Sequence, residues 1–538
     1  MSFAIVCSGL SFAWPDGSTV LDGLDAAFGT GRTGLIGVNG SGKSTLLKLI
    51  ARELRPASGK ISVAGEVGYL PQTLPLDNAR TVSDLLGITS ARAALHAIER
   101  GEATEANFAA IGDDWDVEER ARAELDRLGL DHVGLDRTVP TLSGGEAVMV
   151  GLAALFLARP DVLLLDEPTN NLDLDARRRL YEAVASWPGV LVVVSHDREL
   201  LDRVEEIADL RDGAVRTFGG NLTEYEELLA VEREAAERTV RAAETDMRRQ
   251  KRDLEEAHVK LARRLRYGKK MQESKREPKI VMGERKRQAQ VAAGKHRIMH
   301  EERLAGARAR LTEAEEAVRA DAEIRVGLPA TEVPAGRTVA TVTGLAPPEP
   351  EAGSLTELIV RGPERIALVG PNGSGKTTFL RALTGETVPD GTTVKIGVAG
   401  VRYLPQRLDV LDEGLSVVDN VRAVAPSVPV NEIRAGLARF LFRGARAERP
   451  AGTLSGGERF RAVLASLLLA EPAPQLLLLD EPTNNLDMAS VRQLGQALAG
   501  YQGALLVVSH DLPFLRTIGI TRWLAMDRGS GLSEADPM

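Results

Sequence analysis

The sequence predicts two copies of one α/β domain in tandem, joined by a long α-helical hairpin linker. Three observations predict this architecture. A series of short motifs occurs twice in the same order, apolar runs typical of buried parallel strands precede several of these motifs, and a charged stretch without proline lies between the two series. The offset between matching residues falls from 333 at the lysines of the first motif to 312 at the serines of a later one, so the first copy has 21 more residues between them.

The bulk composition is that of a globular protein. A chain of 538 residues corresponds to three or four domains of about 150 residues. The single cysteine, Cys7, excludes an internal disulfide, fits a reducing compartment and is expected to act as a small hydrophobe in a strand. No apolar run approaches the roughly 20 residues of a membrane helix, and the N-terminal residues lack the basic region of a signal peptide. We therefore expect a cytoplasmic protein.

The first copy begins with short strands that lead to a glycine-rich loop. Residues 1–35 are expected to form strands around a Pro15-Asp16-Gly17 turn, and a buried strand and a helix flank the following Gly-x-x-x-x-Gly-Lys-Ser sequence. Strand, loop and helix in this order predict a phosphate loop, in which backbone N–H groups, a lysine and the helix N-terminus hold a nucleotide and a hydroxyl ligates Mg²⁺. The expected nucleotide-binding residues are Gly37, Asn39, Gly40, Ser41, Gly42, Lys43, Ser44 and Thr45, and in the second copy Gly370, Asn372, Gly373, Ser374, Gly375, Lys376, Thr377 and Thr378.

A glutamine follows the next predicted strand in both copies. The first copy reads Tyr-Leu-Pro-Gln72 and the second Tyr-Leu-Pro-Gln406. The glutamine amide can reach Mg²⁺ and an attacking water; a plain polar loop residue is the alternative, and the repetition favours the functional interpretation. Residues 80–135 are expected to be mostly helical, and the extra residues of the first copy to form a short helical projection.

The sequence Leu-Ser-Gly-Gly-Glu, which we call the signature motif, predicts a helix N-terminus in each copy. Its N–H groups form a second anion site. One domain has no need of two phosphate sites for one nucleotide, whereas two domains stacked head to tail do, since each can close the pocket of the other. The residues concerned are Ser143, Gly144 and Gly145, and Ser455, Gly456 and Gly457.

Two carboxylates and a histidine complete each motif series. A buried strand ends in Asp166-Glu167, and the second copy ends the matching strand in Asp480-Glu481. The aspartate fits a Mg²⁺ ligand and the glutamate a base that deprotonates water; a helix-capping pair is the alternative. His196 and His510 each lie 29 residues after their glutamate, and this repeated spacing favours a γ-phosphate sensor over a structural histidine.

The linker is predicted to be a helical hairpin with a basic tip. One helix is expected from about Leu222 to Lys270, roughly 70 Å at 1.5 Å per residue, and a second from about Glu284 to Ala322. Residues 260–297 hold 14 basic and three acidic residues, although the whole chain carries a net charge of −9. A hairpin whose charges serve only solubility is the alternative. However, repulsion among the basic side chains of this tip favours an anionic partner: DNA, a membrane surface or RNA. The basic residues near the turn include Arg263, Arg264, Arg266, Lys269, Lys270, Lys275, Arg276, Lys279, Arg285, Lys286 and Arg287.

These motifs, in this order, closely resemble those of ATP-binding cassette proteins: the Walker A, Q-loop, signature, Walker B, D-loop and switch-histidine motifs. Two cassettes in one chain without a membrane domain, each with Glu-Pro-Thr-Asn-Asn-Leu-Asp, resemble the ABC-F subfamily. The resemblance implies P-loop ATP-binding cassettes over residues 1–220 and 326–538, with the hairpin over 221–325. It implies ATP hydrolysis with Mg²⁺ held by Ser44, Gln72, Asp166, Thr377, Gln406 and Asp480, and with Glu167 and Glu481 as bases.

The two cassettes differ where the family stacks an aromatic ring on adenine. Trp14 (or less favourably Phe12) fills this position in the first cassette, whereas the matching stretch of the second, around Ala346-Pro-Pro-Glu-Pro-Glu, has no aromatic residue. The segment 326–336 between them is expected to be an extended connector. We therefore expect weaker adenine selectivity at the second site. The signature motifs also differ, since the first continues Glu146-Ala147-Val148 and the second Glu458-Arg459-Phe460-Arg461, and this difference favours unequal turnover at the two sites.

The resemblance also implies a partner and a mechanism. In ABC-F proteins the hairpin enters the ribosomal tRNA exit site, so the expected partners are ribosomal RNA and exit-site tRNA, bound by a monomer in which the two cassettes pair. Apolar residues near the turn (Tyr267, Met271, Ile280, Val281 and Met282) would either stack on bases or hold the two helices together. Translation regulation and antibiotic resistance remain open outcomes. The alternatives are the energising ATPase of a membrane exporter, a DNA-maintenance ATPase and a non-catalytic binding protein.

Overall fold

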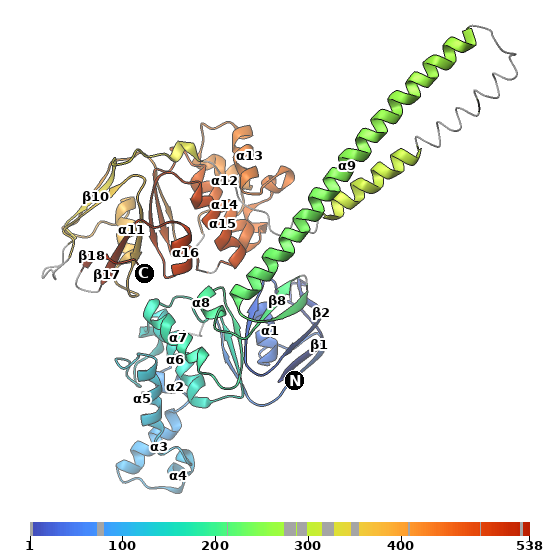
Figure 1. The fold of residues 1–538 in the computed structure, drawn as a ribbon. Helices are drawn as coiled ribbons and strands as arrows, with labels where there is room; N and C mark the ends of the chain where they lie inside the picture. Colours follow the sequence, from blue (N-terminus) through green and yellow to red (C-terminus); the bar gives the residue numbers. More distant parts are fainter. Residues whose placement is uncertain are drawn as a thin grey trace. The chain divides into compact units, whose positions relative to one another are not determined.

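The computed structural model of the protein describes residues 4–72, 80–211, 213–273, 287, 298–314, 328–345, 354–406, 409–484, 486–527 and 531–537. The chain forms two compact units (Figure 1). One unit comprises Met1–Leu222 together with Glu323–Met538 and contains both cassettes; the other comprises Thr223–Ala322.

The first cassette is built on a six-stranded sheet with the strand order β5-β6-β7-β3-β8-β9. All neighbouring pairs are parallel except β8 and β9, and a separate antiparallel sheet has the order β2-β1-β4. Each residue of β6 and β7 is buried, as expected for parallel strands that carry continuous apolar runs. The strands are β1 Ile5–Ala13, β2 Thr19–Phe28, β3 Arg32–Ile36, β4 Ser58–Val63, β5 Val67–Leu70, β6 Val162–Asp166, β7 Val190–Val194, β8 Glu206–Arg211 and β9 Ala214–Gly219.

The helices of the first cassette include the projection expected from its extra residues. In Figure 1, α3 and α4 lie farther from the sheet than α5 does. Phe108 of α4 and Trp115, in the turn between α4 and α5, are exposed, and their ring centroids are 5.9 Å apart. The helices are α1 Lys43–Ile50, α2 Val82–Leu85, α3 Thr89–Glu99, α4 Glu105–Ile111, α5 Val117–Arg127, the 3₁₀ helix η1 Val139–Thr141, α6 Gly144–Ala158, α7 Leu174–Ala185 and α8 Arg198–Leu201.

The second cassette repeats the strand arrangement. Its six-stranded sheet has the order β14-β15-β16-β12-β17-β18, in which only β18 is antiparallel to its neighbour, and its smaller sheet has the order β11-β10-β13. The strands are β10 Thr338–Thr343, β11 Glu357–Arg361, β12 Arg365–Val369, β13 Thr393–Ile396, β14 Val401–Leu404, β15 Leu476–Asp480, β16 Ala504–Val508, β17 Arg522–Asp527 and β18 Gly531–Ala535.

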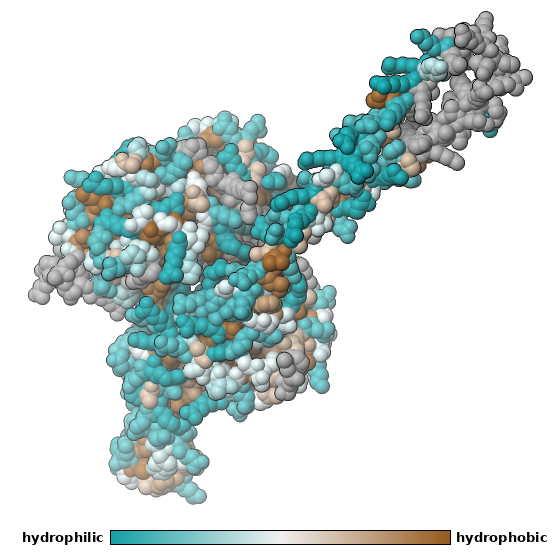
Figure 2. Space-filling model, viewed as in Figure 1, coloured by the Kyte–Doolittle hydropathy of each residue, from teal (hydrophilic) through white to brown (hydrophobic). Residues whose placement is uncertain are grey.

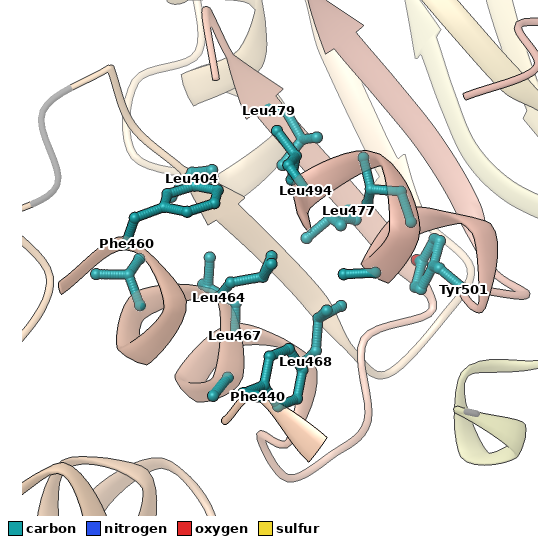
Figure 3. Close-up of a cluster of buried hydrophobic side chains, with 14 of the residues drawn as sticks. Leu404, Phe440, Phe460, Leu464, Leu467, Leu468, Leu477, Leu479, Leu494 and Tyr501 are labelled. Carbon is teal, nitrogen blue, oxygen red and sulfur yellow. The ribbon is translucent and has the colours of Figure 1, made fainter. Parts of the chain in front are cut away.

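The helices of the second cassette pack on this sheet to form its core. Figure 3 shows Leu464, Leu467 and Leu468 of α14 in one buried cluster with Leu477 and Leu479 of β15. The helices are α11 Lys376–Thr384, α12 Val417–Val424, α13 Val430–Arg439, α14 Gly456–Leu468, α15 Met488–Ala499 and α16 Leu512–Thr517, with the 3₁₀ helices η3 Pro329–Thr331, η4 Gly444–Glu448 and η5 Ala451–Thr453. Because η3 lies within the segment expected to be an extended connector, that expectation is wrong for its middle; residues 326 and 327 are outside the described residues.

This topology gathers the motifs of each cassette at one edge of its sheet. In the first cassette β6, β7 and β3 are consecutive neighbours, and all three run in the same direction. Their carboxyl ends therefore lie side by side, and each is followed by a motif: the phosphate loop after β3, the two carboxylates at the end of β6 and the histidine after β7. The strands β15, β16 and β12 do the same in the second cassette.

The linker contains the long helix that the sequence predicts. Helix α9 spans Leu222–Glu273, 52 residues and about 78 Å. Its surface is mostly hydrophilic (Figure 2) and carries Glu–Arg and Glu–Lys pairs four residues apart. Residues 298–314 are helical, and Arg310 in this segment donates a 2.7 Å hydrogen bond to Asp246 of α9.

Only part of the basic tip lies within the described residues. Arg263, Arg266, Lys270 and Arg287 are exposed to solvent. Arg264 and Lys269 belong to α9. Lys275, Arg276, Lys279, Arg285 and Lys286, together with the predicted turn, lie outside the described residues, as do Ile280, Val281 and Met282.

Candidate nucleotide-binding sites

The glycines of both phosphate loops have backbone conformations that other residues rarely adopt. Gly37 and Gly370 have φ values of 152° and 143°. A Cβ atom on Gly37 would lie 2.5 Å from the carbonyl oxygen of Leu210, and one on Gly370 would lie 2.1 Å from that of Met526. These positions therefore require glycine, because the loop passes directly against a neighbouring strand.

The lysine of each loop is buried and turned toward the loop backbone. Lys43 Nζ donates to the carbonyl oxygens of Gly37 and Val38, at 2.7 and 3.1 Å. Lys376 Nζ donates to the equivalent carbonyls of the second loop, at 2.7 and 2.9 Å. Burial lowers the pKa of both lysines, and the neighbouring carboxylates oppose this shift.

Ligands suited to Mg²⁺ lie beside the first phosphate loop. Ser44 Oγ donates a 3.0 Å hydrogen bond to Asp166 Oδ1, so the predicted hydroxyl and carboxylate ligands are in contact. The buried hydroxyl of Ser41 has no hydrogen-bond partner within the described part of the chain. Among the described residues no group of three or more His, Cys, Asp and Glu could hold a metal ion. The donors therefore fit a Mg²⁺ ion that also takes oxygen ligands from phosphate and water.

A tyrosine that sequence reasoning passed over also contacts the aspartate in each cassette. Tyr69 OH donates to Asp166 Oδ2 at 3.3 Å, and Tyr403 OH donates to Asp480 Oδ2 at 3.0 Å. Burial, followed by the charge of Asp480, raises the pKa of Tyr403 to about 12, so this hydroxyl stays protonated and able to donate. The signal was present in the sequence, because this tyrosine begins both copies of the motif that ends in Gln72 and Gln406.

The glutamate and histidine of each cassette face one another. Glu167 Oε1 lies 3.3 Å from His196 Nε2, and Glu481 Oε1 lies 3.3 Å from His510 Nε2. Burial raises the pKa of Glu167 to about 8 and that of Glu481 to about 7, and it lowers the pKa of both histidines to about 3. Both glutamates have positive φ values, 50° and 46°, a strained conformation for a residue with a side chain.

One cavity brings the predicted residues of the first site together. Its volume is about 360 Å³, and its lining includes Trp14, Lys43, Gln72, Glu167 and His196. Trp14 is 39% exposed and stands edge-on to Phe12, with ring centroids 5.1 Å apart. The indole is therefore available to stack on a base. In the second cassette the stretch that matches Trp14 includes residues 346–353, which lie outside the described residues.

Each signature motif begins a helix through a reciprocal pair of hydrogen bonds. Ser143 Oγ accepts from the backbone N–H of Glu146 at 3.2 Å, and the Glu146 carboxylate accepts from the backbone N–H of Ser143 at 2.6 Å. Ser455 and Glu458 repeat this capping box at 3.3 and 3.1 Å. The glutamate of the motif thus orients the serine and the first N–H groups of α6 and α14.

Hydrogen bonds connect the phosphate loop of each cassette with the other cassette. The backbone N–H of Asn39 donates to Asp487 at 3.1 Å, and that of Asn372 donates to Asp173 at 3.3 Å. The side-chain amide of Asn372 also donates to the carbonyl oxygen of Asn171 at 2.6 Å. These acceptors belong to the Asn-Asn-Leu-Asp segments, to which the sequence analysis assigned no contact.

The signature glycines lie at the same junction. A Cβ atom on Gly456 would lie 3.8 Å from that of Asn39, and one on Gly145 would lie 3.5 Å from the side-chain amide of Asn372. The signature motif of each cassette is thus close to the phosphate loop of the other. Gln406 is also at this junction, where its amide donates to Asn171 Oδ1 at 3.3 Å.

Fold and site together define a protein with two ATP-binding cassettes in one chain. Residues 23–170 and 356–484 match the family model described as ABC transporter. The chain is 34% identical over 532 residues to the tylosin resistance ATP-binding protein TlrC of Streptomyces fradiae, covering 92% of each chain. It is 31% identical to the energy-dependent translational throttle protein EttA of Mycobacterium tuberculosis, covering 92% of this chain and 87% of that protein. The chain therefore belongs to the ABC-F subfamily of ATP-binding cassette proteins, and it is an ATP hydrolase.

Comparison with solved structures supports the fold. The structure of an RNase-L inhibitor superposes with a TM-score of 0.57 at 20% sequence identity, covering all of this chain and 90% of that one. No helix within the described residues is both long and apolar enough to cross a membrane.

Proposed function

We propose that this protein binds the ribosome and uses ATP binding and hydrolysis there to regulate translation or to protect the ribosome from antibiotics. The observation that carries the proposal is the charge of the linker tip: residues 260–297 hold 14 basic and three acidic residues on a chain with a net charge of −9. The phosphates of folded RNA would neutralise this positive charge. The similarity along most of the chain to a tylosin resistance protein and to a translational throttle protein favours ribosomal RNA over other polyanions.

Each ATP would be held by the phosphate loop of one cassette and the signature motif of the other. Mg²⁺ would be held by Ser44, Gln72 and Asp166 in one site and by Thr377, Gln406 and Asp480 in the other, where it would neutralise charge on the phosphates. Glu167 and Glu481 would accept a proton from the attacking water, and His196 and His510 would contact the γ-phosphate. The contacts from Asn39 to Asp487 and from Gly456 to Asn39 support this pairing.

The hairpin would transmit the state of the cassettes to the ribosome. In this proposal ATP binding fixes the angle of α9 and holds the basic tip near exit-site tRNA and ribosomal RNA, and hydrolysis releases it. In this proposal the protein acts in the cytoplasm as a monomer whose two cassettes pair with each other. Among the outcomes, antibiotic protection is favoured by the relation to TlrC, which covers 92% of both chains. The shortness of the α3–α4 projection also favours antibiotic protection.

A hydrolysis-deficient variant tests ribosome binding. Glu167→Gln/Glu481→Gln keeps the shape of both side chains but removes both bases, so it should bind ATP, sediment with ribosomes through a sucrose cushion and inhibit growth. The matched control adds Lys43→Ala and Lys376→Ala, which should abolish ATP binding and sedimentation together. A second variant replaces the exposed Arg263, Arg266 and Lys270 with glutamine; it should bind ribosomes more weakly at low salt, and its binding should depend less steeply on salt than that of the unaltered protein.

The outcomes separate the candidate functions. If the hydrolysis-deficient variant stays at the top of the gradient with ATP present, the ribosome proposal fails. ATPase activity stimulated by DNA rather than by ribosomes would indicate a DNA-maintenance ATPase. Cofractionation with membranes would indicate an exporter subunit.

A further inference from the structure

A buried arginine in the first cassette links the segments that follow β7 and β16, which carry the two switch histidines. Arg177 lies in the first turn of α7 and is 9% exposed. Its Nη1 donates to Asp197 Oδ2 at 3.2 Å and to the backbone carbonyl oxygen of His510 at 3.3 Å. Asp197 directly follows His196 in its own cassette, whereas His510 belongs to the other cassette.

Other contacts hold the first-cassette side of this link in place. Tyr181, one turn further along α7, donates a 2.7 Å hydrogen bond to the same Oδ2 atom of Asp197. The other oxygen of Asp197 caps α8 by accepting from the backbone N–H of Leu200 at 3.1 Å. Because Asp197 has these further partners, losing Arg177 leaves it anchored.

The second-cassette side of the link is the histidine that faces Glu481. His510 is 5% exposed, and its Nε2 lies 3.3 Å from Glu481 Oε1. The imidazole and the carbonyl that accepts from Arg177 belong to the same residue. A donor that fixes the carbonyl therefore restricts the backbone rotation that would move the imidazole away from the reacting phosphate.

At the matching position of the second cassette the described structure has no such donor. The offset of 314 between the two glutamates and between the two histidines places Val491 opposite Arg177 and Gly495 opposite Tyr181. Val491 has no hydrogen-bond donor in its side chain and packs on the hydrophobic core of the second cassette. His196 is therefore not served by a matching side chain at this position of α15.

We propose that Arg177 is a positioning residue through which the first cassette sets the geometry of the ATP site containing Glu481 and His510. The inference rests on the proposed roles of those two residues in hydrolysis. It makes turnover at the Glu481 site dependent on a side chain of the opposite cassette, whereas the Glu167 site meets Arg177 only through Asp197 of its own cassette. The two ATP sites therefore differ in how strongly their turnover depends on Arg177.

The test measures each site separately in the full-length protein. Glu167→Gln leaves only the Glu481 site active, and Glu481→Gln leaves only the Glu167 site active. In the first background Arg177→Met, which keeps the side-chain length and removes the donors, should lower kcat about tenfold with little change in the KM for ATP. In the second background the loss of kcat should be several times smaller, because Asp197 keeps Tyr181 and its helix cap.

Two further variants separate positioning from folding. Arg177→Lys keeps the positive charge beside Asp197 and should recover part of the lost kcat in the Glu481-only background. Arg178→Met is the matched control, because the Arg178 side chain is 65% exposed and pairs with Asp175 of the same helix; it should leave both backgrounds unchanged. Equal losses of kcat in both backgrounds, or no loss in the Glu481-only background, would overturn the proposal. Failure of the ribosome proposal would appear only in the sedimentation assay, which does not depend on Arg177.

Discussion

Removing one hydroxyl group from Tyr403 should weaken the use of Mg²⁺ at the second ATP site. Tyr403→Phe keeps the ring and removes only the donor that lies 3.0 Å from Asp480 Oδ2. A hydrogen bond to a charged group contributes about 1.5–3 kcal/mol when fully buried, and Tyr403 is only half-buried, so we take about 1 kcal/mol. This corresponds to about a fivefold rise in the Mg²⁺ concentration that gives half-maximal hydrolysis.

The equivalent change in the first cassette should have a smaller effect. Tyr69 OH lies farther from its aspartate, at 3.3 Å, and Asp166 also accepts a hydrogen bond from Ser44 at 3.0 Å. Tyr69→Phe should therefore raise the half-maximal Mg²⁺ concentration by about twofold.

The assay is ATP hydrolysis as a function of free Mg²⁺ at saturating ATP. Tyr403→Phe is measured in the background Glu167→Gln and Tyr69→Phe in the background Glu481→Gln, so that each rate reports one site. If both variants lose kcat with no change in the half-maximal Mg²⁺ concentration, the tyrosines do not orient the metal ligand and the reasoning is refuted. An effect larger for Tyr69 than for Tyr403 would also contradict the distances.

The remaining predictions concern the base site, the phosphate loop and a helix cap. Trp14→Ala should raise the KM for ATP of the first site several-fold with a smaller change in kcat, whereas Trp14→Phe should restore most of the affinity; equal KM values for all three proteins would exclude stacking. Gly370→Ala should abolish nucleotide binding at the second site, measured with a fluorescent ATP analogue, because its Cβ would meet the Met526 carbonyl. Burial opposes ionisation of Glu146, but hydrogen bonds from Ser143 and His132 lower its pKa to about 2. The cap therefore contributes stability above the unfolded pKa of about 4.3, and the difference in unfolding free energy between the protein and Glu146→Gln should shrink as pH falls from about 4 toward 2.

The sequence predicted those parts of the site that depend on local chemistry. Asp166 ends β6, Glu167 follows it, and the glycine loop that leads to Lys43 follows β3; these motifs meet because the carboxyl ends of the parallel strands share one edge of the sheet. The length of α9 was also predictable, since its residues form an uninterrupted helical pattern. These features need no knowledge of how distant segments meet.

Contacts between segments far apart in the chain were not predictable in this way. Arg177 meets the carbonyl oxygen of a residue 333 positions away, and no spacing rule connects the two. Tyr69 and Tyr403 were visible as a repeat, but their role depends on the pairing of β5 with β6 and of β14 with β15, which places each ring next to an aspartate. The break in the connector at η3 was missed because Pro329 also suits a 3₁₀ turn.

The aspartates that cap α7 and α15 each use one carboxylate oxygen within their own helix and the other to accept a hydrogen bond from the opposite cassette. Asp173 Oδ1 accepts from the N–H of Ala176 in its own helix, while Oδ2 accepts from Asn372 of the other cassette; Asp487 does the same with Ser490 and Asn39. Separation of the halves would thus release one oxygen to water and leave each helix capped. In the proposed hydrolysis cycle, cassettes that separate would therefore keep α7 and α15 capped and ready to pair again.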